Sequence, residues 1–285
     1  MSSSPLRPES ALANTWTIAR RELRDALRSR WFALNTAAFV LLGVGVSFLS
    51  ASAGGGGGLS GFGRTTAGLV NLVTLVVPLM ALTAGAGSVA GERERGMLAF
   101  LLSQPVSRVE VIAGKWLGLA LALAASIFLG FGLCAAIVAT RANADGAGAL
   151  VALAMLSLFL ALGMLGIGLL ISVLSRRTSV ATGLAVFCWL LLAFATDLGL
   201  MAGTLTWKLS IQTILAACLA NPLQVFKIWS LDAAGIPLDV LGPVGQYTMD
   251  RLPNALPWIA AASLTLWAIV PGASAALLFA RKPAA

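Results

Sequence analysis

Residues 91–115 read GERERGMLAFLLSQPVSRVEVIAGK and lie between two long apolar stretches. Four alternating charges open this segment, large apolar side chains follow them, and Pro105 ends the apolar cluster before a second basic stretch. Charges at this density are too costly for the hydrocarbon core of a membrane. The segment therefore predicts a short cytoplasmic helix held between two membrane-spanning helices.

The composition places the chain in a membrane. Of its 285 residues, 59% are hydrophobic and 11% are charged, whereas a soluble domain carries about a quarter charged residues. The net charge of +8 does not indicate a nucleic-acid partner, because no run of Lys and Arg alternates with aromatic residues on a soluble module. We expect an all-α polytopic membrane protein.

Residue types that usually hold metals or act as nucleophiles are scarce. The chain has no histidine, and its three cysteines are widely spaced in apolar sequence. Gly114 and Lys115 lack the earlier glycine that a phosphate-binding loop requires. We therefore expect no enzyme activity and no cofactor or metal bound by this chain. If ATP drives the protein, another chain binds the ATP and its magnesium ion.

Six apolar stretches are long enough to cross a membrane, because a hydrocarbon core of about 30 Å requires about 20 helical residues. Residues 1–30 are expected to form a cytoplasmic N-terminus, and 31–285 a single transmembrane domain with a cytoplasmic segment at 91–114 and an outer region at 201–255. The predicted spans lie near residues 31–50, 66–90, 115–140, 149–174, 178–200 and 256–280.

The N-terminal segment predicts an amphipathic helix over residues 15–30. Four arginines fall mostly on one side, and we expect the other side to lie on membrane lipid at the inner interface. The apolar side is formed by Trp16, Ala19, Leu23, Ala26 and Leu27.

The distribution of basic residues predicts the orientation, because short cytoplasmic loops hold most Lys and Arg. With both termini in the cytoplasm, most of the 19 Lys and Arg residues fall on the inner side. The exceptions are Arg64, Arg141, Lys208, Lys227 and Arg251. This asymmetry indicates a multi-pass protein with both termini inside.

The outer region contains an apolar stretch at 209–219 that is short for a span and suits an interfacial or re-entrant helix. Asn221 and Pro222 break it, and the sequence beyond them, as far as Pro257, has no helical periodicity. This region is the sizeable outer surface of the chain, so we expect an outer partner to bind there. The expected contact residues are Asn221, Pro222, Lys227 and Tyr247.

Asp197 is an acid close to the outer end of the fifth predicted span. A carboxylate is costly to place in a membrane, so it usually has a structural or functional role there. One reading is an interfacial carboxylate within reach of water or a basic partner. The other reading is a group on a substrate path.

The segment at 91–115 resembles the hallmark of type-2 ABC-transporter permeases. The resemblance rests on the charge pairs before Gly96, on the leucines that follow, on the Pro-Val-Ser-Arg run at 105–108 and on the Gly-Lys pair at 114–115. Met97 stands where the family has threonine. The resemblance implies the type-2 ABC exporter fold, a homodimer in the bacterial inner membrane, and a separate cytoplasmic ATPase under each subunit.

Within that family, short motifs at 19–28, around Asp197 and at 220–228 resemble the permeases that serve maturation of nitrous oxide reductase. That resemblance implies a periplasmic partner and a system that supplies copper or sulfur for the copper-sulfide centres of the reductase. Two alternatives remain: a generic exporter of a drug, lipid or ion, and a membrane scaffold that transports nothing.

The resemblance also implies that residues 92–104 form the coupling helix, which docks on the ATPase. Its apolar residues would be buried anchors, and its charges would set the register of docking. A helix lying on lipid headgroups would instead be predominantly basic. The predicted docking residues are Glu92, Arg93, Glu94, Arg95, Gly96, Leu98, Phe100, Leu101 and Leu102.

Overall fold

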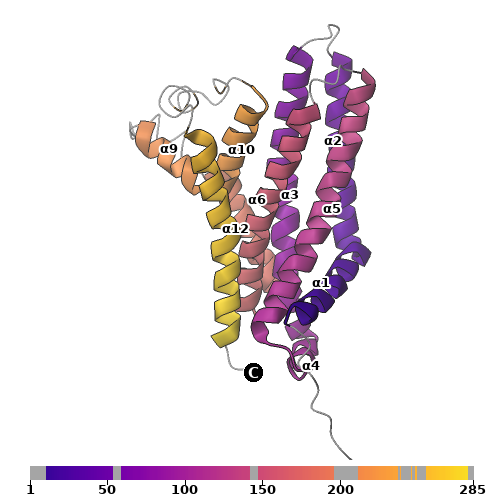
Figure 1. Ribbon diagram of the computed structural model, residues 1–285, viewed down its shortest axis with the longest axis vertical. Helices are drawn as coiled ribbons and strands as arrows, with labels where there is room; N and C mark the ends of the chain where they lie inside the picture. Colours follow the sequence, from indigo (N-terminus) through magenta and orange to yellow (C-terminus); the bar gives the residue numbers. More distant parts are fainter. Residues whose placement is uncertain are drawn as a thin grey trace, which may run out of the picture.

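The computed structural model describes residues 11–53, 59–141, 147–195, 211–236 and 255–281, together with 238, 245 and 248. The described part is helical and forms an elongated bundle (Figure 1). Its elements are α1 (Ala11–Arg28), α2 (Arg30–Ala53), α3 (Leu59–Glu94), α4 (Met97–Leu102), α5 (Arg108–Arg141), α6 (Ala147–Leu174), α7 (Thr178–Leu190), the π-helical turn η2 (Leu191–Ala195), α9 (Ile211–Ala220), α10 (Pro222–Ala233) and α12 (Leu256–Arg281).

Five of the described helices are long and apolar enough to cross a membrane, and they correspond to predicted spans. They are α2, α3, α5, α6 and α12. Of the span predicted at 178–200, the structure describes residues 178–195, which form α7 and η2. Asp197 lies outside the described residues. The all-α polytopic fold is thus confirmed, and the described residues contain five long spans with α7 as a shorter apolar helix.

α6 lies at the centre of the bundle and packs along α3 and α12. It is apolar on every side, as expected of a helix that neighbours surround. A Cβ on Gly168 would lie 2.5 Å from the carbonyl oxygen of Leu82, and one on Gly85 would lie 2.8 Å from that of Leu165. Glycine at these two positions therefore lets the backbones of α3 and α6 approach closely.

α1 lies against the lower half of α5 (Figure 1). A Cβ on Gly118 would lie 2.4 Å from the carbonyl oxygen of Ala19, so α1 rests directly on the α5 backbone. Ile18, Ala19 and Ala26 are buried in this contact, whereas Trp16 is exposed. The predicted amphipathic helix is present, and its apolar residues divide between α5 and the outside of the bundle.

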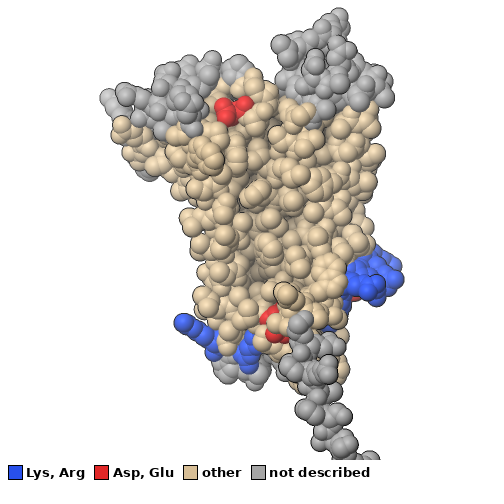
Figure 2. Space-filling model, viewed as in Figure 1, with Lys and Arg blue, Asp and Glu red and all other residues tan. Residues whose placement is uncertain are grey.

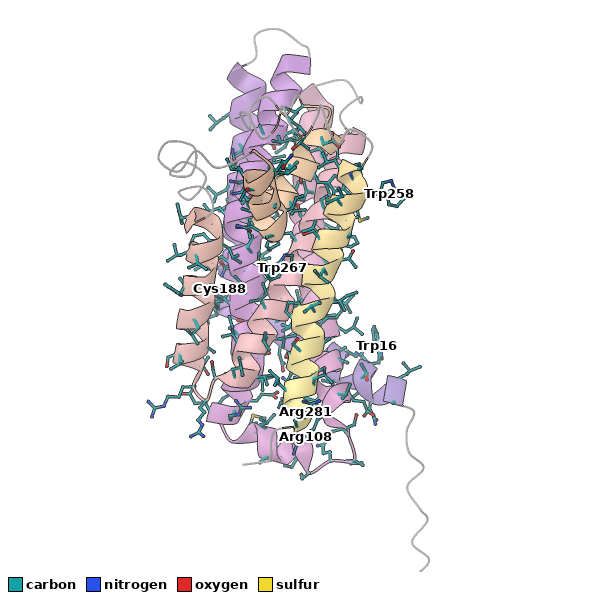
Figure 3. All side chains as sticks on the ribbon, turned by 90° about the vertical axis from the view of Figure 1, so that its left-hand side faces the viewer. Trp16, Arg108, Cys188, Trp258, Trp267 and Arg281 are labelled. Atoms are coloured by element: carbon teal, nitrogen blue, oxygen red, sulfur yellow. The ribbon has the colours of Figure 1, made fainter. Side chains whose placement is uncertain are left out.

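The described Lys and Arg side chains that are visible in Figure 2 gather towards the lower end of the bundle. We call this the basic end. It contains α1, α4, the turn between α6 and α7 and the last turn of α12, which lies beside Arg108 (Figure 3).

The opposite end is formed in part by α9 and α10, which meet at an angle of 103° (Figure 1). The predicted break at Asn221 is present, because its side-chain oxygen accepts a hydrogen bond from the amide of Leu223 and begins α10. Although the sequence beyond Pro222 has no helical periodicity, residues 222–233 form α10. α10 is buried on several sides, and a helix of that kind has no clear apolar period in its sequence.

The predicted outer contact residues do not form one surface. Asn221 and Pro222 are buried, and the Asn221 amide donates to the carbonyl of Leu192 at 2.6 Å. Both residues therefore belong to the joint between helices, which corrects their assignment to a partner surface. Lys227 is partly buried, and Tyr247 lies outside the described residues.

Gly85→Ala should lower the melting temperature of the purified protein in detergent, because the added methyl group would press on the α6 backbone. Overpacking of this kind costs about 1–3 kcal/mol. Gly87→Ala is the matched control, since a Cβ at Gly87 meets nothing within 4 Å. Equal melting temperatures for the two variants would contradict the close approach of α3 and α6.

Candidate docking site at the basic end

The short predicted helix is α4, and it is smaller than the sequence indicates. α3 continues through Glu94, so the charges at 92–94 belong to the end of a span. Gly96 then adopts a left-handed conformation, with φ of 73°, and α4 begins at Met97. A residue with a Cβ is strained in that conformation, which explains why a glycine stands at the turn.

The apolar residues of α4 point in two directions. Leu98 and Leu101 are 8% and 7% exposed and join the core of the bundle. Phe100 is 68% exposed, and Met97 beside it is also exposed. Phe100 is therefore accessible at the surface, whereas Leu98 and Leu101 hold α4 against the bundle. This finding corrects the assignment of Leu98 and Leu101 as docking anchors. The side chain of Leu102 lies outside the described part.

Lys115 is the buried centre of a cluster of charges. Its side chain is 1% exposed, and its Nζ lies 2.5 Å from Oε1 of Glu22 and 3.0 Å from Oε2 of Glu92. Arg21 lies 3.5 Å from the other oxygen of Glu92 and 3.7 Å from Asp25. The cluster thus joins α1, α3 and α5.

This arrangement corrects the predicted role of Glu92. Its side chain is 6% exposed and faces inward, so it does not lie on a surface that a partner contacts. A buried ion pair is costly to form and very costly to break, because removal of one member leaves an uncompensated charge. We therefore assign Glu92 to the joint between α3, α1 and α5.

The next two residues of α3 cap the ends of other helices. The Arg93 guanidinium donates to the carbonyl of Val173 at 3.3 Å and also to that of Ser175, at the end of α6. The Glu94 carboxylate accepts from the amide of Thr178 at 3.0 Å, at the start of α7. A cation at a helix C-terminus and an anion at a helix N-terminus both match the helix dipole.

Arg95 lies in the turn after α3, and its Nε donates to the carbonyl of Gly91 in that helix at 3.1 Å. Together, residues 92–95 hold the end of α3 against α1, α5, α6 and α7. We call this set of contacts, with Lys115 and Glu22, the charge hub. The predicted docking charges are therefore largely occupied within the chain.

The second half of the loop is closed by a capping box at the start of α5. The Ser107 hydroxyl accepts from the amide of Glu110, and the Glu110 carboxylate accepts from the amide of Ser107. Asn14 of α1 donates to the same carboxylate, and Arg108 donates to the carbonyl of Phe279 in α12. Both ends of the segment that carries α4 are thus fixed to neighbouring helices.

The sequence reasoning missed Lys115 and Glu22 as members of this site. For Lys115 a signal was present, because it is a charged residue at the border of an apolar stretch, where an unpaired charge is costly. Glu22 gave no such signal, since it lies among the arginines of the amphipathic segment. No group of metal-ligating side chains occurs among the residues that the structure describes.

Lys115→Met should destabilise the protein by about 3–5 kcal/mol, because it leaves Glu22 and Glu92 buried without their shared cation. The expected result is a large fall in melting temperature. Arg24→Met, at an exposed position of α1, is the control and should change it little. Adding Glu22→Gln and Glu92→Gln to Lys115→Met should recover part of the loss, and no recovery would contradict the ion-pair account.

Comparisons with known proteins show the family of the chain. A protein from Pseudomonas aeruginosa named probable ABC transporter permease protein NosY is 34% identical over 275 residues, covering 94% of this chain and 98% of the relative. A protein of the same name from Stutzerimonas stutzeri is 30% identical over 250 residues, covering 86% and 91%. The ABC-2 family transporter protein family matches residues 16–283. The chain belongs to this family and is the transmembrane permease subunit of an ABC transporter.

Proposed function

We propose that α4 is the element on which a separate ATP-hydrolysing subunit docks, and that the basic end faces the cytoplasm. The observation that carries this proposal is the exposure of Phe100 and Met97 on a short helix whose other side is held in the bundle. Large apolar side chains that project beside charged residues are typical anchors of a protein interface.

The distribution of basic residues supports this orientation. The described arginines of α1, of the α6–α7 turn and of the start of α5 lie at the basic end. Positive residues remain on the cytoplasmic side of a membrane. The described chain begins in α1 and ends in α12 at this same end, which supports cytoplasmic termini in a bacterial inner membrane.

The protein would work as part of a larger assembly. ATP shifts a permease between two states only if the docked ATPase interacts differently with each state. We infer that two copies of this chain form a homodimer, each with an ATPase chain that binds ATP and magnesium. The wide apolar exposure of α2, α7 and α12 leaves surface for a second copy and for lipid.

We further propose a role like that implied by the resemblance to the permeases of nitrous oxide reductase maturation. The relatives named NosY support this role through their similarity over nearly the whole chain. The assembly, together with a periplasmic partner, would then supply copper or sulfur for the copper-sulfide centres of the reductase. An exporter of another substrate and a scaffold without transport are the competing functions.

Phe100→Asp should abolish copurification of the ATPase chain with the tagged permease, because it places a charge at the centre of an apolar contact. Loss of such an anchor costs at least about 2 kcal/mol of association. The measurement is pull-down from detergent-solubilised membranes, followed by mass spectrometry.

The control for that experiment is Phe100→Leu, which keeps the apolar surface and should retain the ATPase. The melting temperature of both variants should stay close to that of the unmodified protein, since the side chain is exposed. Normal ATPase recovery with Phe100→Asp would remove α4 from the docking surface. Recovery of no ATPase with the unmodified chain would favour the scaffold.

Nitrous oxide reductase purified from a host that lacks this chain should contain less copper than the reductase of the parent strain. The physical reason is that the copper-sulfide centre would lose its supply. Copper content by mass spectrometry of metals is the measurement, and re-expression of the chain is the control. A reductase with full copper content would favour an exporter of another substrate.

A further inference from the structure

The turn between α6 and α7 depends on two residues that lie outside both helices. α7 begins after Arg177, whose side chain makes no capping hydrogen bond. Its first amide, that of Thr178, donates instead to Glu94 at the end of α3. Arg93 holds the carbonyls at the end of α6 in the same way. One dipeptide of α3 thus supplies the caps for both sides of the turn.

α7 packs on α3 along one side and is exposed on its other side. Only Ala181 and Ala185 are buried, and it packs mainly on α3. Figure 3 shows α7, which carries Cys188, at the edge of the bundle. Its exposed apolar residues, with those of η2, are Val180, Leu184, Phe187, Leu190, Leu191 and Phe194. A helix with so few buried contacts shifts at lower cost than the central α3 or α6.

The far end of α7 has a polar joint as well. The Asn221 amide donates to the carbonyl of Leu192 in η2 at 2.6 Å. A π-helical turn leaves backbone groups out of the regular ladder, and here the joint between α9 and α10 takes one of them. Polar contacts thus hold both ends of α7, in addition to its packing on α3.

The first turn of α7 lies at the basic end of the bundle, and only a short stretch of chain connects its contact residue Glu94 to α4. Only Arg95 and Gly96 separate Glu94 from the start of α4, and Arg95 is hydrogen-bonded back to Gly91. A displacement of α4 would act on Glu94 through these two residues, and Glu94 accepts from the first amide of α7. The contacts thus link the exposed Phe100 to α7 without passing through the core of α6.

We propose that Arg93 and Glu94 are positioning residues that transmit the movement of α4 to α7 by holding the α6–α7 turn to the end of α3. This inference rests on the proposed docking of an ATPase at α4. In this proposal α7 is the helix that moves when α4 moves. Asn221 holds the other end of α7 through the carbonyl of Leu192.

The test uses the reconstituted complex of permease and ATPase chain. Glu94→Ala should leave the ATPase bound, because Phe100 is unchanged. The measured quantity is the rate of ATP hydrolysis by the complex divided by the rate of the isolated ATPase. In Glu94→Ala this ratio should differ from that of the unmodified complex by on the order of 5-fold or more, the lower range of coupling between two sites. The nucleotide-dependent change in hydrogen exchange of residues 178–190 should also be lost.

A second variant separates transmission from simple capping. Adding Arg177→Asp to Glu94→Ala gives α7 an N-cap of its own without a link to α3. We expect this double variant to recover the melting temperature lost in Glu94→Ala while ATP hydrolysis and the exchange response stay abnormal. Recovery of all three would show that Glu94 only stabilises α7 and would overturn the proposal.

The outcomes also separate this inference from the proposed function. If the unmodified permease binds no ATPase, the docking proposal fails. If the ATPase binds and Glu94→Ala keeps both the normal hydrolysis rate and the exchange response of α7, docking stands and transmission through Glu94 is overturned. Glu94→Gln is a further control, since its amide oxygen still accepts from Thr178, and it should retain more of the response than Glu94→Ala.

Discussion

The buried ammonium group of Lys115 between the carboxylates of Glu22 and Glu92 is the interaction on which the basic end depends. Each of these charges would be very costly to bury without a partner, and here each carboxylate is paired with the ammonium group. The three residues come from α5, α1 and α3, so the cluster fixes the end of α3 relative to the start of α5. α4 lies between these two points, and its position follows from theirs.

The polar contacts and the small-residue contacts have different parts in this fold. In the middle of the bundle, glycines such as Gly85 and Gly168 allow close packing of α3 on α6. At the basic end, side chains of α3 satisfy backbone groups that the ends of α6 and α7 leave free. The middle of the bundle is thus held by close packing, and its basic end is held by charged hydrogen bonds and ion pairs.

Five spans could be predicted from the sequence because their apolar runs have the length of a bilayer. A short helix before Pro105 could also be predicted, although its start was placed at residue 92 and α4 begins at Met97. The inward direction of Glu92 could not be predicted, because the cluster brings together residues as far as 93 positions apart. α10 was missed because a helix buried on several sides has no amphipathic period. The buried roles of Leu98 and Leu101 were missed for a similar reason, since sequence does not show which side of a short apolar helix meets the bundle.

We propose that the charge hub and α4 form one unit that carries an ATPase. The most direct test is cryo-electron microscopy of the complex with the ATPase chain, with and without bound nucleotide. The account predicts that Phe100 is covered by the ATPase, and that the contacts of Lys115 with Glu92 and of Glu94 with Thr178 persist in both states. A complex in which Phe100 faces solvent, or in which α4 moves while the end of α3 and the start of α7 separate, would contradict it.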